Sequence, residues 1–185
     1  MVRFLKYLGI LAGLLIVLII VWLSTLDGKY DTFRSRTINA PAEIIFGFVD
    51  DYKEWPKWDP WTEAFGDNME VSYSGNKNGV GAKYTWKGEE SGEGNMETIG
   101  SSPYSSIDQV INFLKPFESS SDIYWQFEET EKGTKVTWGM KGEMPFYMRW
   151  MAAAMDENME KDLLRGLEKL DSISVLASQR TQVSE

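Results

Sequence analysis

Five short turn-forming segments divide residues 69–142 into six extended runs. The segments lie at residues 75–81, 88–92, 101–103, 115–116 and 131–133. They are rich in residues that favour tight reversals of the chain, chiefly glycine, asparagine, serine and proline. The extended runs between them cover residues 69–74, 82–87, 93–100, 105–113, 118–129 and 134–142. Each connection is too short for the crossover that parallel strands need, so the sequence predicts six consecutive antiparallel strands.

Alternation within these runs predicts a sheet with one apolar face. Residues two apart in a strand share a face. In three of the runs the apolar face comprises Ile107, Ile111, Phe113, Ile123, Trp125, Phe127, Val136, Trp138 and Met140. Gln109 is the polar exception on that face. An apolar sheet face must be covered by another layer of the chain.

The C-terminal part of the chain predicts the covering layer. After Met144 and Pro145, a helical pattern runs to about Leu176. Its apolar stripe, at spacings of three and four residues, consists of Met151, Met155, Met159, Leu163, Leu167 and Leu170. The residues after Ala177 are polar and predict a frayed tail.

The segment before the six strands predicts one more strand followed by helices. Lys29 to Asn39 has extended character, and Asn39 with Pro41 indicates the start of a short apolar helix. Residues 50–61 contain two prolines and three tryptophans, Trp55, Trp58 and Trp61, and predict broken helix or loop. We expect these three indoles to close one end of the space between sheet and C-terminal helix.

Several local segments carry a resemblance to a known superfamily. They are Arg34–Val49 (RSRTINAPAEIIFGFV), Trp55–Trp61 (WPKWDPW), Tyr73–Gly75, Gly79–Trp86 (GVGAKYTW), Gly92–Gly94, Lys115–Glu118 (KPFE) and Gly133–Trp138 (GTKVTW). With these segments and the order β-α-α-β6-α, the chain from Lys29 to Leu176 resembles the SRPBCC or START-like superfamily, of the bacterial polyketide cyclase/dehydrase and lipid transport type (polyketide cyclase 2-like). The resemblance implies an α+β helix-grip fold, in which a curved antiparallel sheet wraps around a long C-terminal helix and leaves a cavity.

The N-terminus carries nineteen uncharged residues from Leu8 to Leu26. As a helix they span about 28 Å, close to the hydrocarbon thickness of a bilayer. The alternative is a cleaved signal peptide, but its apolar region is usually shorter and ends in a small-x-small site. We expect an uncleaved single-pass anchor. Arg3 and Lys6 precede the span and place the N-terminus in the cytoplasm and the domain outside it.

These features predict three parts of the chain. Residues 1–28 form the membrane anchor, residues 29–177 the helix-grip domain, and residues 178–185 a polar tail.

Composition excludes several classes of chemistry and partner. The chain has neither cysteine nor histidine, which excludes disulfides, Cys/His metal sites and catalytic pairs that contain either residue. All 28 acidic residues follow Leu26, and 2 of the 19 basic residues precede it, which leaves 17 in the remainder. That acidic balance argues against a nucleic-acid partner and against electrostatic attachment of the domain to anionic lipid. We expect no metal and no cofactor.

The inward rows of the sheet and the first half of the C-terminal helix predict the cavity lining. The expected lining residues are Trp58, Trp61, Trp86, Met96, Gln109, Ile111, Trp125, Trp138, Met151, Met155 and Met159. Methionine can repack around varied guests and gathers on the first half of the helix, whereas leucine occupies the second. Gln109 and two threonines, Thr85 and Thr137, are candidate polar contacts to a ligand.

No acidic residue stands out as a catalyst. The candidates are Asp59, Glu93, Glu97 and Asp108. Alternation places Glu93 and Glu97 on the solvent face, opposite Met96. Asp59 lies in a Trp-Asp-Pro-Trp segment, where an aspartate caps a turn or shapes the cavity entrance.

The resemblance specifies the fold better than the activity, because the superfamily includes lipid carriers, hormone receptors, aromatic cyclases, oxygenase subunits and chaperone activators. We expect a membrane-anchored domain that binds a hydrophobic small molecule or lipid. A cyclase- or dehydratase-like enzyme and a protein-interaction module of the chaperone-activator type are the alternatives. A buried ionised carboxylate at the cavity would favour the enzyme, and a solid core would favour the interaction module.

Overall fold

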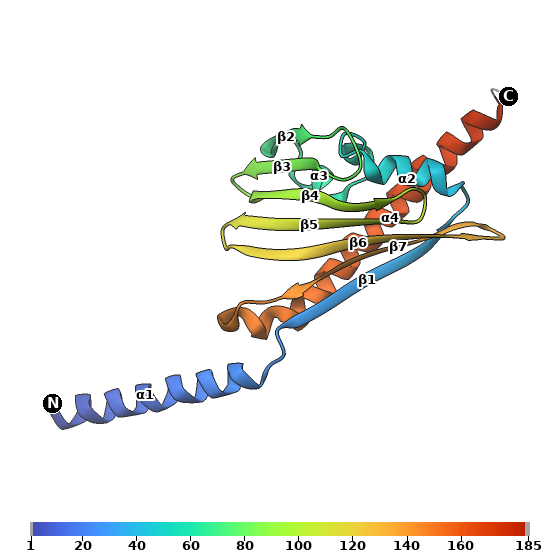
Figure 1. Ribbon diagram of the computed structural model, residues 1–185. Helices are drawn as coiled ribbons and strands as arrows, with labels where there is room; N and C mark the ends of the chain where they lie inside the picture. Colours follow the sequence, from blue (N-terminus) through green and yellow to red (C-terminus); the bar gives the residue numbers. More distant parts are fainter. Residues whose placement is uncertain (1, 184–185) are drawn as a thin grey trace.

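The computed structural model describes the backbone of residues 2–183 and the side chains of residues 3–152 and 158–181. Within this part of the chain, seven antiparallel strands form one curved sheet (Figure 1). The strands are β1 (Lys29–Ile38), β2 (Glu70–Gly75), β3 (Ala82–Gly88), β4 (Gly92–Ser102), β5 (Ser106–Lys115), β6 (Ser119–Thr130) and β7 (Gly133–Glu143). The six strands predicted by the turn pattern agree with β2 to β7 to within two residues at every end.

The order across the sheet is β1-β7-β6-β5-β4-β3-β2, so the first strand pairs with the last and β2 to β7 form a meander. One continuous row of paired residues crosses the sheet through Tyr30, Gly142, Ser121, Ile111, Met96, Tyr84 and Tyr73. This row lies near the start of β1. Because the N-terminal helix α1 (Val2–Thr25) directly precedes β1, the end of the sheet on this side of the row is the end nearest to α1.

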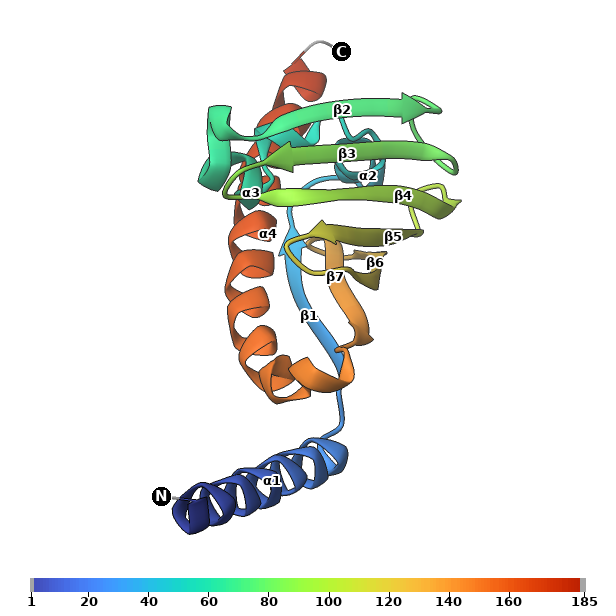
Figure 2. The ribbon, with the colours of Figure 1, turned by 90° about the vertical axis from the view of Figure 1, so that its left-hand side faces the viewer.

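Helices cover the inner face of the sheet. The long helix α4 (Ala152–Val183) runs along this face (Figure 2). The short helix α3 (Pro60–Phe65) lies beside the middle of α4, where Glu63 pairs with Arg165 and Lys169, and α2 (Ala42–Asp50) packs against α4 as well. Single turns of 3₁₀ helix at Trp55–Lys57 and Gly66–Asn68 flank α3, and a longer 3₁₀ segment at Phe146–Met151, η3, precedes α4. This arrangement confirms the helix-grip α+β fold.

Stacked aromatic rings form the centre of the core. The indoles of Trp125 and Trp138 stack with centroids 4.4 Å apart, and Trp58 meets both edge-on at 5.7 and 5.5 Å. Leu163, Leu167 and Leu170 of α4 are buried against the sheet. Leu167 and Leu170 therefore belong to the packed core, whereas Leu163 also borders the cavity described below.

Ion pairs fix α4 to the first strand. Arg36 of β1 lies 2.7 Å from Asp171 on α4. Arg34, two residues earlier on the same strand, pairs with Glu160 of α4. Because β1 is an edge strand of the sheet, these contacts hold the helix over that edge.

Helix boundaries differ from the prediction in three places. The N-cap position of α2 is Pro41, and no side chain caps the helix there, so Asn39 does not have the predicted capping role. The segment after Pro145 begins as 3₁₀ helix, and within it Arg149 donates to Glu143 at 3.0 Å and to the carbonyl of Leu26 at 3.5 Å. Finally, α4 continues beyond Leu176 to Val183.

The extension of α4 has a tertiary cause. Ser174 and Ser178 are both buried, and α2 packs against α4. Packing stabilises helical turns whose polar composition alone predicts fraying. Residues 178–183 are therefore helical, and residues 184–185 lie outside the described part of the chain.

Candidate functional site

The tryptophan-rich loop folds back onto the end of α2. The indole N–H of Trp55 donates to the carbonyl of Val49 at 2.8 Å, and that of Trp58 donates to the carbonyl of Phe48 at 3.0 Å. The last carbonyls of a helix lack intrahelical partners. The two indoles supply those partners while their rings enter the core, and the loop is thereby held against the inner face of the sheet.

Asp59 shapes the next turn of the loop. Its Oδ2 accepts hydrogen bonds from the backbone N–H of Thr62 at 2.8 Å and from the Thr62 hydroxyl at 2.6 Å, and its Oδ1 accepts from the N–H of Trp61 at 3.3 Å. This is an N-cap of α3, with Pro60 at the first helical position. Burial raises the pKa of the carboxyl, although hydrogen bonds from Thr62 and Trp61 oppose that shift.

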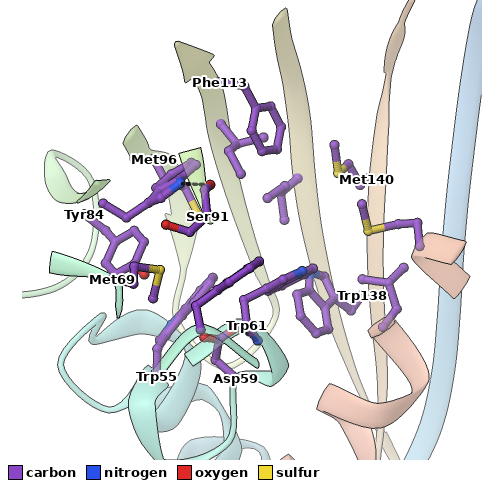
Figure 3. A pocket seen from close by; sticks show the side chains of 16 residues that line it. Trp55, Asp59, Trp61, Met69, Tyr84, Ser91, Met96, Phe113, Trp138 and Met140 are labelled. Carbon is purple, nitrogen blue, oxygen red and sulfur yellow. Dashed lines mark hydrogen bonds between the residues drawn. The ribbon is translucent and has the colours of Figure 1, made fainter. Parts of the chain in front are cut away.

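A cavity of about 310 Å³ lies between this loop, the sheet and α4. Figure 3 shows side chains of the loop and of the sheet directed toward a common space. The sheet contributes Tyr84, Trp86, Met96, Ile111, Phe113, Ile123, Trp138 and Met140; the loop contributes Trp55, Asp59, Trp61, Phe65 and Met69; Ser91 comes from the β3–β4 turn, and Met159 and Leu163 come from α4. The lining is apolar apart from Asp59, Ser91, the hydroxyl of Tyr84 and the indole N–H groups.

The few polar groups at the cavity differ in how far they are engaged. The indole N–H of Trp86 donates to the carbonyl of Ser91 at 3.3 Å. The indole N–H of Trp138 has no hydrogen-bond partner among the described residues, but its nitrogen is enclosed by neighbouring atoms and does not open onto the cavity. Burial raises the pKa of the Tyr84 hydroxyl, which is therefore neutral. The cavity thus offers few polar groups on an apolar surface, among them the neutral hydroxyl of Tyr84.

The residues predicted to line the cavity have four different outcomes. Six of them line it in the structure: Trp61, Trp86, Met96, Ile111, Trp138 and Met159. Trp58, Gln109 and Trp125 lie in the core and are at most 1% exposed. Met151 is partly buried in η3 and is not part of the lining. The side chain of Met155 lies outside the described residues.

A buried hydrogen-bond network explains the position of Gln109. Its Oε1 accepts from the indole N–H of Trp125 at 3.1 Å, and its Nε2 donates to the hydroxyl of Tyr52 at 3.0 Å. The hydroxyls of Tyr52 and Thr98 are also 3.0 Å apart. Gln109 therefore supplies hydrogen-bond partners to buried polar groups of the core. The threonines also differ from the prediction, because Thr85 is exposed and Thr137 bonds Ser35 on the first strand.

Eight lining residues were absent from the predicted set and from the three-tryptophan loop: Phe65, Met69, Tyr84, Ser91, Phe113, Ile123, Met140 and Leu163. Strand parity contains the signal for four of them, because Tyr84 shares a face with Trp86, Phe113 with Ile111, Ile123 with Trp125, and Met140 with Trp138. Leu163 belongs to the apolar stripe of the helix. Phe65 ends the short helix α3, and Met69 and Ser91 lie in turns; all three segments are too short for a period to identify the inward side.

A comparison with known protein families identifies the family of this chain. The family described as polyketide cyclase / dehydrase and lipid transport matches residues 32–173. The chain belongs to this family. No curated protein sequence matches the chain.

Solved structures with this fold share little sequence with this family member. A protein of unknown function from Staphylococcus aureus superposes with a TM-score of 0.64 at 11% identity, covering 83% of this chain and 98% of that chain. The di-domain ARO/CYC protein StfQ of the steffimycin biosynthetic pathway gives 0.63 at 8% identity, with 83% and 53% covered. A protein from Mesorhizobium loti gives 0.57 at 15% identity, with 77% and 95% covered. At these identities the likeness shows the fold alone.

The other acidic candidates of this polyketide cyclase / dehydrase and lipid transport domain lie away from its cavity. Glu93 is 2.9 Å from Lys115, which lowers the pKa of the Glu93 carboxyl, and Glu97 is 2.9 Å from Lys83. Asp108 is exposed. Among the described residues, no group of acidic side chains is arranged to hold a metal ion. Asp59 is the acidic residue of the lining, and both its oxygens are occupied by the α3 cap.

Proposed function

We propose that this chain is a membrane-anchored domain that binds a hydrophobic small molecule or lipid in the cavity between the sheet and α4. The observation that carries the proposal is the space itself. Folded cores are packed with few voids larger than a water molecule. A cavity of about 310 Å³ with an apolar lining is unusual in a solid core and is at the lower end of the sizes found for ligand pockets.

The polar groups support a ligand with a modest polar end. Apolar pockets commonly use a small number of polar groups to orient a guest. The Tyr84 hydroxyl and Ser91 in the lining support a ligand that carries one or two hydrogen-bonding groups, since buried polar groups in folded proteins are normally hydrogen-bonded. A protein-interaction module would need no such cavity. The engaged carboxylate of Asp59 favours binding over acid–base catalysis.

Filling the cavity should abolish binding without unfolding the protein. Met159 is partly exposed and lines the cavity from α4, so Met159→Trp places an indole in the space with little disturbance of the sheet. We expect loss of binding of a fluorescent fatty-acid analogue, with the melting temperature nearly unchanged. Leu164→Trp is the matched control, because Leu164 lies on the same helix, is 40% exposed and does not line the cavity.

Two results would contradict ligand binding. One is a wild-type protein that binds no apolar probe and contains no co-purified small molecule by native mass spectrometry. The other is equal probe binding by the wild type, Met159→Trp and Leu164→Trp, which would locate the probe elsewhere.

The anchor part of the proposal rests on α1. From Arg3 to Thr25 this helix is long and apolar enough to cross a membrane, and it projects away from the domain (Figure 1). Its end is joined to the domain: Leu23 is buried, and Arg149 lies 3.5 Å from the carbonyl of Leu26. These contacts favour a retained anchor over a cleaved leader. The proposed division is an anchor of residues 1–28 and a domain from residue 29 to the end of α4.

N-terminal sequencing of the protein extracted from membranes should return the residues that begin α1, and alkaline washing should leave the protein in the membrane. A mature N-terminus near Lys29 with the domain in soluble fractions would contradict this prediction. The charges of Arg3 and Lys6 favour a cytoplasmic N-terminus. Protease added outside the membrane should therefore digest the domain, whereas digestion only from the cytoplasmic side would reverse the orientation.

A further inference from the structure

The junction between α1 and the domain sets the direction of the helix. The N–H of Met144 donates to the carbonyl of Gly28 at 2.8 Å, and Arg149 lies against the same glycine. A Cβ atom at Gly28 would lie 2.8 Å from Cγ of Arg149 and 3.0 Å from the carbonyl oxygen of Met144, so the chain passes closely between these groups. Together with buried Leu23, these contacts pack the end of α1 against η3.

One end of the sheet faces the direction in which α1 projects. Lys29 pairs with Glu143, and strand pairing places the β5–β6 and β3–β4 turns at that same end. In Figures 1 and 2 this end of the sheet and η3 lie on the side toward which α1 extends from the domain. If α1 crosses a bilayer along its axis, this end of the domain is the end that meets the membrane surface.

Large apolar side chains are exposed at this end. Phe146, Tyr147 and Trp150 of η3 are 43%, 58% and 56% exposed, and Phe117 of the β5–β6 turn is 56% exposed. We call these four residues the strand-end patch. Aromatic side chains, and tyrosine and tryptophan above all, favour the boundary between headgroups and hydrocarbon.

Partly exposed residues of the cavity lining, here called its rim, lie at the same end. Phe113 lines the cavity just before the β5–β6 turn, and Ser91 lines it from the β3–β4 turn. Both are partly exposed, as is Met159 about two turns of helix after η3. The patch and the rim are thus neighbours on the surface that faces along α1.

We propose that the strand-end patch rests in the interfacial layer of the bilayer that α1 crosses, with the rim of the cavity facing lipid. This inference rests on the anchor in the proposed function and adds an orientation and an interaction surface to it. The β3–β4 turn carries Glu89 and Glu90, and the domain is acidic, so apolar contact drives the docking. Anionic lipid should therefore not strengthen it.

The absence of cysteine permits a direct test on the full chain, reconstituted in phosphatidylcholine vesicles. Single substitutions Trp150→Cys and Phe117→Cys carry a polarity-sensitive fluorophore at the patch. Val80→Cys is the matched control, because Val80 is 53% exposed at the opposite end of the sheet. Leu14→Cys, in the middle of α1, reports whether the helix crosses the hydrocarbon.

At Trp150→Cys and Phe117→Cys, we expect the fluorophore emission to shift to the blue. Nitroxide phosphatidylcholine labelled in the headgroup region should quench it, and aqueous iodide should not. At Val80→Cys, iodide should quench the fluorophore. Added phosphatidylglycerol should not increase the effect. If Leu14→Cys is deep in lipid but either patch position behaves like Val80→Cys, the proposed orientation is overturned and the anchor stands. If Leu14→Cys is also aqueous, the anchor fails and the orientation fails with it; ligand binding is tested separately by Met159→Trp.

Discussion

Replacing Trp58 with alanine should lower the free energy of unfolding by about 3–5 kcal/mol, the usual range for truncation of a buried aromatic side chain. Trp58 is fully buried, meets Trp125 and Trp138 edge-on, and donates to the carbonyl of Phe48. Truncation therefore removes the ring contacts and leaves a helix-end carbonyl without its partner. Chemical denaturation of the full chain in detergent measures this loss.

Trp61→Ala is the control for Trp58→Ala. Trp61 is only half-buried and lines the cavity, with one edge-on contact to Trp138 at 5.7 Å. We expect a clearly smaller loss of stability at Trp61 and a larger change in the affinity for an apolar probe. If both substitutions lower the free energy of unfolding equally and leave binding unchanged, Trp61 is a core residue like Trp58. That result would contradict the assignment of Trp61 to the cavity lining.

A second large effect is expected on α4. Leu167→Ala should cost about 2–5 kcal/mol, because Leu167 is fully buried in the solid part of the core. Met159→Ala should cost much less, since Met159 borders a space that already exists and its removal creates little new cavity. Thermal or chemical unfolding gives the stabilities, and titration with a fluorescent lipid gives the affinities.

The two α4 variants separate a ligand space from a packed interior. The hypothesis predicts opposite profiles: Leu167→Ala loses stability and keeps its affinity per folded molecule, whereas Met159→Ala keeps stability and changes affinity. Equal destabilisation at both positions, together with a wild type that binds no lipid, would defeat the ligand-binding proposal and favour an interaction module.

The fold could be predicted from the sequence because its signals are local. Turn residues such as Gly75 and Gly133 adopt positive φ and mark the strand ends, and alternation around Trp125 and Trp138 marks the inner face. The end of α4 could not be predicted in this way. Ser174 and Ser178 are polar, and their burial depends on α2, which is distant in sequence.

The site could be predicted only in part, because parity gives the face of a residue but not its depth. Trp125 and Trp138 share the inner face, yet only Trp138 borders the cavity. The difference arises from the loop: Trp55 and Trp58 both meet Trp125 edge-on, whereas Trp138 lies against Trp58 and the cavity-lining Trp61. How a loop with Pro56 and Pro60 folds has no periodic signature, so the space that it leaves open becomes visible only in three dimensions.

The distribution of tryptophan gives this protein two built-in optical reporters. Four of its eight tryptophans, Trp55, Trp61, Trp86 and Trp138, border the cavity, and Trp58 and Trp125 lie beside them in the core. Neighbouring rings in this set, such as Trp55 with Trp58 and Trp125 with Trp138, are close enough for electronic coupling. The other two, Trp22 and Trp150, lie on α1 and in the strand-end patch. Near-ultraviolet circular dichroism of the coupled rings should therefore register occupancy of the cavity without a label. Red-edge emission from Trp22 and Trp150 would report hydration near the anchor separately.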